Sequence, residues 1–157
     1  MLHGFRRFLK ANEGVTAIEF AIVSPPLIFL LLGIIEYSII FHLQSLATHA
    51  GNEASRMGKT GASYCDPAIP RDDCIRSAVL EVMGSWVTPA RPMVVNVSSL
   101  GRLGSGGLAS GAGGGGELVL YQSLMYWKPM TPFFFSAIAN AQGIPITASV
   151  LVKNEDF

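Results

Sequence analysis

The residues that most directly suggest chemistry lie near the N-terminus, where Gly14 precedes Val15 and Glu19 follows four residues later. Glycine before a peptide bond suits a peptidase cleft that admits no side chain. Cleavage after Gly14 would create an α-amine on Val15, and such amines carry a positive charge near neutral pH because their pKa is about 7.7–8.0. Glu19 lies one helical turn further on, so its carboxylate can neutralise this amine or that of a neighbouring chain. The spacing predicts a processing site between Gly14 and Val15.

An apolar segment follows, from Phe20 to Phe41, whose only ionisable residues are Glu36 and Tyr37. At about 1.5 Å per residue, a helix of this length crosses a hydrocarbon core of about 30 Å. A carboxylate in such a span is normally paired or functional. We therefore expect a transmembrane helix in which Glu36 either pairs with another subunit or, as we favour, lies near the outer headgroups.

Basic residues precede this segment, at Arg6, Arg7 and Lys10, whereas no Lys or Arg follows it until Arg56. Positive charge is retained on the cytoplasmic side, so residues 1–14 are expected to form a cytoplasmic leader with the C-terminal part outside. A secretory signal has a shorter apolar core and a small-x-small cleavage site close behind it. The pattern favours a single-pass anchor.

The helical pattern continues beyond the apolar segment, because small and apolar residues recur there at spacings of three and four. One helix, or two joined at a kink, is expected from about Thr16 to Met57. Pro25 and Pro26 interrupt it, either as a tolerated kink or as an unwound segment that lets helices pack. The small residues that allow close helix packing, or that face the protein's own sheet, are Ala47, Ala50, Gly51 and Ala54.

Cys65 and Cys74 are the two cysteines of the chain, and they enclose a short segment rich in turn-forming residues. In a reducing compartment they would be free thiols, but no further cysteines or suitably placed histidines complete a zinc site. Outside the cytoplasm a disulfide closing this loop would stabilise the fold by about 2–3 kcal/mol. We predict a Cys65–Cys74 disulfide and no metal site.

Residues 59–157 predict an α+β module. Asp72 or Asp73 caps a helix with an apolar stripe, and Trp86 and Trp127 are expected in the core rather than in a ligand site. Three segments alternate as strands do, and a helix followed by strands indicates an antiparallel sheet packed against helices. These strands are expected at 93–100, 117–127 and 146–155.

Residues 101–116 are rich in glycine and predict a flexible hairpin loop. A phosphate-binding loop requires Gly-Lys-Ser/Thr in a strand–loop–helix context. The sequence GKT at 58–60 follows a predicted helix, and Glu53 occupies the position of the first required glycine. We interpret this match as coincidental.

Neither a catalytic set nor a cofactor site is recognisable in the sequence. The histidines are His3, in the leader, and His42 and His49, which are expected on solvated helix faces. No metalloprotease or nucleophile motif is present. No basic stripe with interleaved aromatic residues indicates nucleic acid as a partner. The composition therefore favours a structural or interaction protein over an enzyme, and a small envelope hydrolase is disfavoured.

The segment NEGVTAIEFAIVSPPLIFLLLGIIEYS, residues 12–38, resembles the N-terminus of TadE-like pseudopilins of the tight-adherence (Flp) type IV pilus system. In this resemblance Gly14, Val15 and Glu19 match a prepilin processing site, with glutamate at the fifth position after the cut. Phe20 stands where such sites often have tyrosine. Weaker similarity is carried by NEASRMGKTG, YWKPMTPFF and ASVLVKNEDF.

The resemblance implies that prepilin peptidase removes residues 1–14 and leaves a helix over 15–58. It also implies other pilins or pseudopilins and an inner-membrane assembly platform as partners. The chain would be a bacterial inner-membrane protein with a periplasmic C-terminus, or part of the pilus itself. The alternative is an uncleaved single-span anchor carrying an extracytoplasmic binding module, in which Gly14 and Glu19 have no special role.

Overall fold

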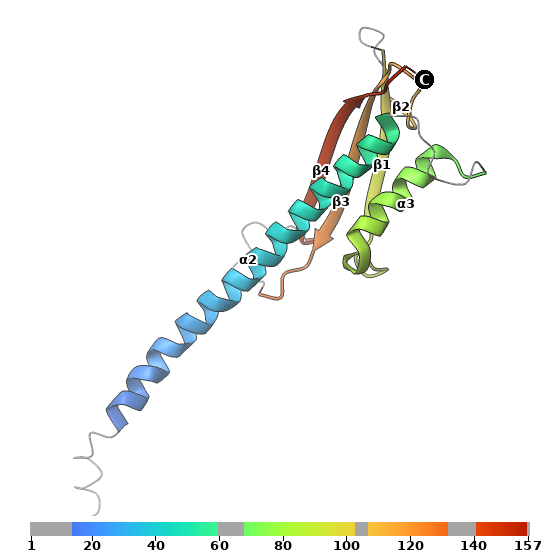
Figure 1. The fold of residues 1–157 in the computed structure, drawn as a ribbon. Helices are drawn as coiled ribbons and strands as arrows, with labels where there is room; N and C mark the ends of the chain where they lie inside the picture. The colour runs from blue at the N-terminus through green and yellow to red at the C-terminus, as the bar shows by residue number, and fades with distance from the viewer. Residues whose placement is uncertain (1–13, 60–67, 103–106, 132–140, 157) are drawn as a thin grey trace, which may run out of the picture.

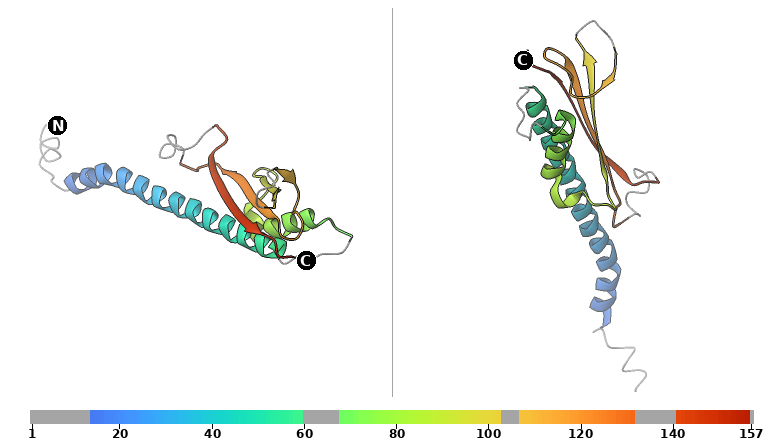
Figure 2. Two further views of the ribbon diagram at one scale, coloured as in Figure 1. Left: turned by 90° about the horizontal axis from the view of Figure 1, so that it is seen from above. Right: turned by 90° about the vertical axis from the view of Figure 1, so that its right-hand side faces the viewer.

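The structure is a computed structural model that describes residues 14–59, 68–102, 107–131 and 141–156. A long helix, α2, is followed by helix α3, a short 3-10 helix, η2, and four strands. Figures 1 and 2 show the N-terminal half of α2 projecting alone, while its C-terminal half lies along the sheet beside α3. The expected α+β class is therefore confirmed. The elements are α2 (Val15–Lys59), α3 (Arg71–Met83), η2 (Gly84–Trp86), β1 (Met93–Gly101), β2 (Ala109–Ser110), β3 (Leu118–Trp127) and β4 (Ile144–Lys153).

Helix α2 is continuous and includes both Pro25 and Pro26. Of the two interpretations of this pair, the unwound segment is therefore wrong. Each proline removes one backbone donor and leaves one carbonyl of the preceding turn without its usual partner. The helix persists because, in an apolar segment, it remains the conformation that satisfies the other backbone groups internally.

The sheet is antiparallel throughout, with the strand order β2-β1-β3-β4. Val97 of β1 is paired with Tyr121 of β3, which is paired in turn with Val150 of β4. The predicted alternation is confirmed on β3 and β4, where every second residue faces the helices. The buried members of this face on β3 and β4 are Val119, Tyr121, Ser123, Met125, Trp127, Ile144, Ile146 and Ala148.

The core lies between this sheet face and the two helices, and α2 contributes mainly small side chains to it. Ala47, Ala50 and Ala54 are almost completely buried. A Cβ added to Gly51 would lie 3.1 Å from Cγ2 of Val150. The small residues therefore face the protein's own sheet, which is one of the two roles expected for them. They let the backbone of α2 approach β4 closely.

The N-terminus of α3 differs from the expectation that Asp72 or Asp73 caps it. Pro70 is the N-cap residue, and no side chain caps the helix by a hydrogen bond. The Pro70 carbonyl accepts hydrogen bonds from the backbone of Asp73 and Cys74 at 3.0 and 3.1 Å. The carboxylate of Asp72 is used elsewhere, because its Oδ1 accepts a hydrogen bond from the backbone nitrogen of Ala112 at 2.8 Å.

Cys74 is buried in the first turn of α3 and takes part in a disulfide. The predicted partner, Cys65, lies outside the described residues. The predicted pairing therefore remains a prediction.

The second half of the glycine-rich segment is held in place rather than free. The backbone nitrogen of Gly111 donates a hydrogen bond to the Val97 carbonyl at 3.0 Å. Nδ2 of Asn154, which is 1% exposed, donates to the carbonyls of Ala112 and Gly114 at 2.9 and 3.1 Å. Residues 109–114 of the expected flexible loop are therefore hydrogen-bonded to β1, Asp72 and Asn154, and the flexibility of the loop stays a prediction. Residues 103–106 lie outside the described part of the chain.

Candidate functional site

The predicted processing residues lie at the exposed start of α2. Gly14 precedes the helix, and a Cβ added to it would meet no atom of the described residues within 4 Å. Val15 is 49% exposed, and Glu19 is exposed one turn further along the helix. The peptide bond between Gly14 and Val15 therefore lies away from the folded module. Arg6, Arg7 and Lys10, the predicted basic leader, are outside the described residues.

The apolar segment runs from Phe20 to Phe41, and as far as Ile35 it presents large hydrophobic side chains on all sides of α2. Of the helices that the structure describes, α2 alone is long and apolar enough to cross a membrane, and its most apolar stretch is not buried by the rest of the protein. Exposed side chains include Phe20 at 70% and Phe41 at 67%. Figure 1 shows this half of α2, in blue, extending beyond the sheet. Such a surface requires an apolar environment around the helix.

A shallow apolar hollow of about 820 Å³ runs along one side of this exposed half. Gly33 lies in its middle, and a Cβ there would meet nothing within 4 Å in the described structure. A glycine with open space beside it allows another helix or a lipid chain to approach the backbone. The residues lining the hollow are Pro26, Phe29, Leu30, Gly33, Ile34, Tyr37 and Ser38.

Glu36 ends the free part of α2, because it is 1% exposed and fully engaged with the module. Oε1 accepts a hydrogen bond from Nε1 of Trp127 at 2.8 Å. Oε2 accepts hydrogen bonds from the backbone nitrogens of Met130 and Thr131 at 2.9 and 3.1 Å, and from Oγ1 of Thr131 at 3.3 Å. These partners within its own chain replace the partner subunit that was one expectation for Glu36, and its expected position near the headgroups stays a prediction.

Aromatic residues surround this junction. The Trp86 and Trp127 rings meet edge to face with their centroids 6.0 Å apart, and the ring of His42 on α2 lies 5.9 Å from Trp86. The guanidinium of Arg91 lies over the Trp127 ring, 5.1 Å from its centroid. Trp127 is buried and Trp86 half-buried, which agrees with the core role predicted for both. The junction therefore joins α2, η2 and the end of β3.

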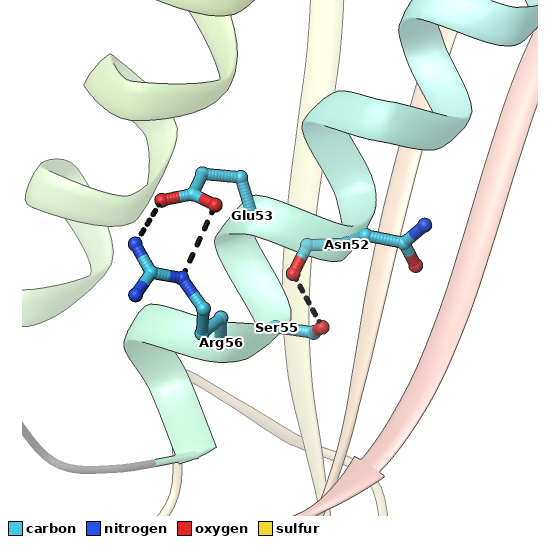
Figure 3. Close-up of polar contacts among 4 residues, drawn as sticks. All are labelled: Asn52, Glu53, Ser55 and Arg56. Carbon is cyan, nitrogen blue, oxygen red and sulfur yellow. Dashed lines mark hydrogen bonds and ion pairs between the residues drawn. The ribbon is translucent and has the colours of Figure 1, made fainter.

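A group of polar residues lies on the surface of a single turn of α2, closer to its C-terminus, and Figure 3 shows this group. Arg56 forms two contacts with the Glu53 carboxylate, with Nη2 at 2.6 Å and Nε at 3.2 Å. These contacts hold the pKa of Glu53 below its ordinary value. Oγ of Ser55 donates a hydrogen bond to the Asn52 carbonyl at 2.7 Å. Because Arg56 is largely exposed, this pair contributes little to stability.

No group of three or more His, Cys, Asp or Glu residues that could hold a metal ion occurs within the described ranges. His49 is exposed on α2, and His42 contacts Trp86 rather than a second titratable group. The chemistry that this part of the chain offers is therefore an accessible peptide bond, an apolar helix and the buried junction at Glu36.

Comparison with known proteins adds one match. A family model described as TadE-like protein covers residues 14–56. No curated protein and no solved structure matches the chain. The match begins at Gly14 and ends at Arg56, so it covers nearly all of α2. The TadE-like resemblance predicted from the sequence is confirmed for this segment, which carries both the exposed apolar half of α2 and Glu36.

Proposed function

We propose that this chain, TadE-like over residues 14–56, is a pseudopilin-like membrane protein of the tight-adherence (Flp) pilus system. It acts as a structural and interaction protein rather than as an enzyme, and prepilin peptidase cleaves it between Gly14 and Val15. The observation that carries the proposal is that the family match begins at Gly14, one residue before the exposed helix α2 begins at Val15. A substrate of a membrane peptidase needs its scissile bond outside the folded domain, and Gly14 meets this requirement.

Cleavage would place a cationic amine on the first residue of α2. The N-terminus of a helix already carries partial positive charge, so a second positive charge in an apolar environment needs a nearby anion. Glu19 is exposed one turn from Val15 and makes no described contact with the module. Its carboxylate is therefore available to the new amine of the same chain or to that of a neighbouring pilin.

The exposed half of α2 supplies the surface on which other pilins or the inner-membrane assembly platform would pack. Gly33 and Pro26 leave a hollow on one side of the helix, and larger side chains flank this hollow. Van der Waals packing at such small residues is a main source of helix association in membranes. In this proposal the module stands outside the membrane, with the N-terminus on the cytoplasmic side.

The test is the intact mass and N-terminal sequence of protein extracted from membranes of cells with and without active prepilin peptidase. We expect a chain that starts at Val15, that is absent without the peptidase and that is lost in Gly14→Phe. Gly33→Phe is the matched control, because it adds the same side chain to the same helix away from the bond. A start at Met1 in every case would refute cleavage.

The alternative function, an uncleaved anchor with a binding module, is favoured by the sheet face that points away from the helices. Val94 on β1 and Leu151 on β4 are 52% and 55% exposed there. A hollow of about 210 Å³ on the same face is lined partly by Asn96, Gln122 and Thr147. A start at Met1, together with a ligand that this face binds, would establish the alternative.

A further inference from the structure

A third hollow lies at the end of the module that meets α2, and its lining is more strongly charged than those of the other two. It has a volume of about 330 Å³, and its polar lining includes Arg91, Tyr126, Lys128 and Gln142. Two of these side chains are cationic, and no acidic residue is among those that line it in the described structure. We call it the basal hollow. Its chemistry suits an anion.

The hydrogen bonds of Glu36 determine the position of the basal hollow along the axis of α2. Trp127 and Met130, which flank Lys128 in the sequence, are both bonded to the Glu36 carboxylate. Phe41 ends the apolar segment five positions beyond Glu36, about 7.5 Å further along the helix axis. The segment that carries Lys128 therefore contacts α2 within its apolar stretch. If α2 crosses a membrane, the basal hollow lies at the level of the lipid headgroups.

The two cations of the basal hollow are not neutralised by the described parts of the chain. Neither Arg91 nor Lys128 forms an ion pair there, whereas Arg56 and Lys59 at the far end of α2 contact Glu53 and Glu155. Arg91 is instead positioned by its stacking over Trp127. A guanidinium with its donors available and an exposed ammonium can bind phosphate oxygens together.

The aromatic residues of this end match the same environment. Trp86, Trp127 and Tyr126 are concentrated where the module meets the apolar helix. Trp and Tyr are enriched at membrane interfaces, where an apolar ring and a polar group meet two different surroundings. Trp86 and Tyr126 are half-buried and can take this role, whereas Trp127 is buried against Glu36 and contributes by positioning Arg91.

We propose that the basal hollow binds the phosphate of an anionic phospholipid from the leaflet on the module's side. Arg91 and Lys128 contact the phosphate, and Tyr126 and Gln142 provide polar groups beside the headgroup. The inference requires that α2 is inserted in the membrane, but it requires neither cleavage after Gly14 nor assembly into a pilus. Phospholipid binding would fix the height and the orientation of the module above the bilayer.

The test uses the full chain in equimolar vesicles of phosphatidylglycerol and phosphatidylcholine, with brominated acyl chains on one lipid or on the other. Bromine quenches tryptophan emission at short range. Of the two tryptophans of the chain, Trp127 lies under Arg91 of the basal hollow, and the Trp86 ring lies 6.0 Å from the Trp127 ring. Comparing the two labelled mixtures gives the preference for the anionic lipid within each variant. If a substitution changes the intrinsic tryptophan emission of a variant, the lipid preference measured for that variant is therefore not affected.

We expect the wild type to prefer phosphatidylglycerol by about fivefold or more, since each cation near an anionic surface contributes a factor of about five. The double variant R91Q/K128Q should lose most of this preference. The matched control is K59Q/K153Q, which removes two cations from the opposite end of the module. The control should keep the preference of the wild type.

Three results would overturn the inference: equal quenching by both lipids in the wild type, an unchanged preference in R91Q/K128Q, or an equal loss in the control. Adding inorganic phosphate to the vesicles distinguishes the two possible ligands, a lipid phosphate and a free phosphate ion. If it abolishes the preference at unchanged ionic strength, the basal hollow is a site for free phosphate rather than for lipid. Failure of the wild type to co-float with neutral vesicles would refute insertion of α2 itself, a result distinct from absence of a lipid preference.

Discussion

Nε1 of Trp127 donates a hydrogen bond of 2.8 Å to the carboxylate of Glu36, although the two residues are 91 positions apart in the sequence. Glu36 belongs to the exposed apolar half of α2, and Trp127 is the last residue of β3. The bond therefore connects the segment capable of crossing a membrane to the end of β3, one of the two inner strands of the sheet. Two backbone nitrogens of the turn after β3 share the same carboxylate.

Replacing Glu36 should weaken the folded module. In Glu36→Gln the amide offers one acceptor and places an N–H₂ group against donors, so buried donors lose their partners. We expect the free energy of unfolding to fall by about 3 kcal/mol, as for other buried hydrogen bonds to a charged group. Denaturant unfolding of the full chain in detergent, followed by the emission of its two tryptophans, Trp86 and Trp127, measures this change.

Glu19→Gln is the matched control for this experiment, because Glu19 is an exposed glutamate on the same helix. It should leave the unfolding free energy within about 0.5 kcal/mol of the wild type. Equal stability of the two variants would show that the hydrogen bonds of Glu36 do not hold the module to α2.

Gly58 is the position where α2 tolerates a side chain least. A Cβ there would lie 1.6 Å from Oη of Tyr121, which is buried and finds no hydrogen-bond partner within the described parts of the chain. Gly58→Ala must displace the tyrosine ring, and we expect it to cost about 1–3 kcal/mol of stability, measured by denaturant unfolding. Gly33→Ala, at a glycine with open space beside it, should change stability little.

The unpartnered hydroxyl of Tyr121 suggests a second variant, for which the expected change in stability has the opposite sign. Burial raises the pKa of Tyr121 above its ordinary value, which reflects how poorly water reaches its hydroxyl. Tyr121→Phe removes a buried polar group that has no partner, so it should leave stability unchanged or increase it by about 1 kcal/mol. A loss of more than this in the same unfolding assay would mean that the hydroxyl is satisfied in solution.

Glu117 should make the module sensitive to acid. Oγ of Ser99 and the backbone nitrogen of Gly114 donate hydrogen bonds to its Oε2 at 2.7 and 3.1 Å, and they hold its pKa below the ordinary value. A lowered folded-state pKa stabilises the fold above the unfolded value of about 4.3, and this contribution disappears as pH falls through the folded pKa.

The variant Glu117→Gln should therefore be less stable than the wild type at neutral pH, with the difference closing as the pH is lowered towards 3. Unfolding free energies measured across that range test the expectation. Glu81→Gln is the control, since Glu81 is an exposed glutamate on α3. A difference for Glu117→Gln that persists at the lowest pH would contradict the electrostatic explanation.

Asn154 should control the order of the glycine-rich segment. Its amide donates hydrogen bonds to two carbonyls of that segment, and Asn154→Ala removes both at a cost of about 2 kcal/mol. We expect faster hydrogen exchange at the amides of Gly111 and Ala112, with the amides of α2 near Ala50 unchanged. Acceleration in both places would indicate general destabilisation instead.

The sequence was sufficient to predict the elements with strong periodicity. Helix α2, helix α3 and the three long strands follow from their spacing of apolar residues, and Val119 and Ile146 face the core as expected. The TadE-like segment was also recognisable, because Gly14, Val15 and Glu19 precede an apolar run at fixed spacing. Local patterns are sufficient for these features because each depends on residues close together in the chain.

Contacts between distant residues were not predictable in this way. The partners of Glu36 lie on the turn after β3, and no local pattern connects them to α2. Asp72 was expected to cap α3, but it lies inside the first turn, after the N-cap residue Pro70, and its carboxylate accepts a hydrogen bond from the backbone of Ala112. The glycine-rich segment likewise owes its order to Asn154, a residue from the end of the chain.

Because α2 is one continuous helix, a tilt of its N-terminal half also moves its C-terminal half and the attached module. The 45 residues of α2 extend about 68 Å without a hinge, and the module is fixed to the distal part of this rod from Glu36 onward. A tilt of about 20°, typical of membrane helices, would move the far end of the rod sideways by about 23 Å. Tilt towards the sheet presses Arg91 and Lys128 into the bilayer surface, and tilt away lifts them out. Because helices tilt to match bilayer thickness, the thickness of the membrane would influence how far the module leans over the bilayer surface.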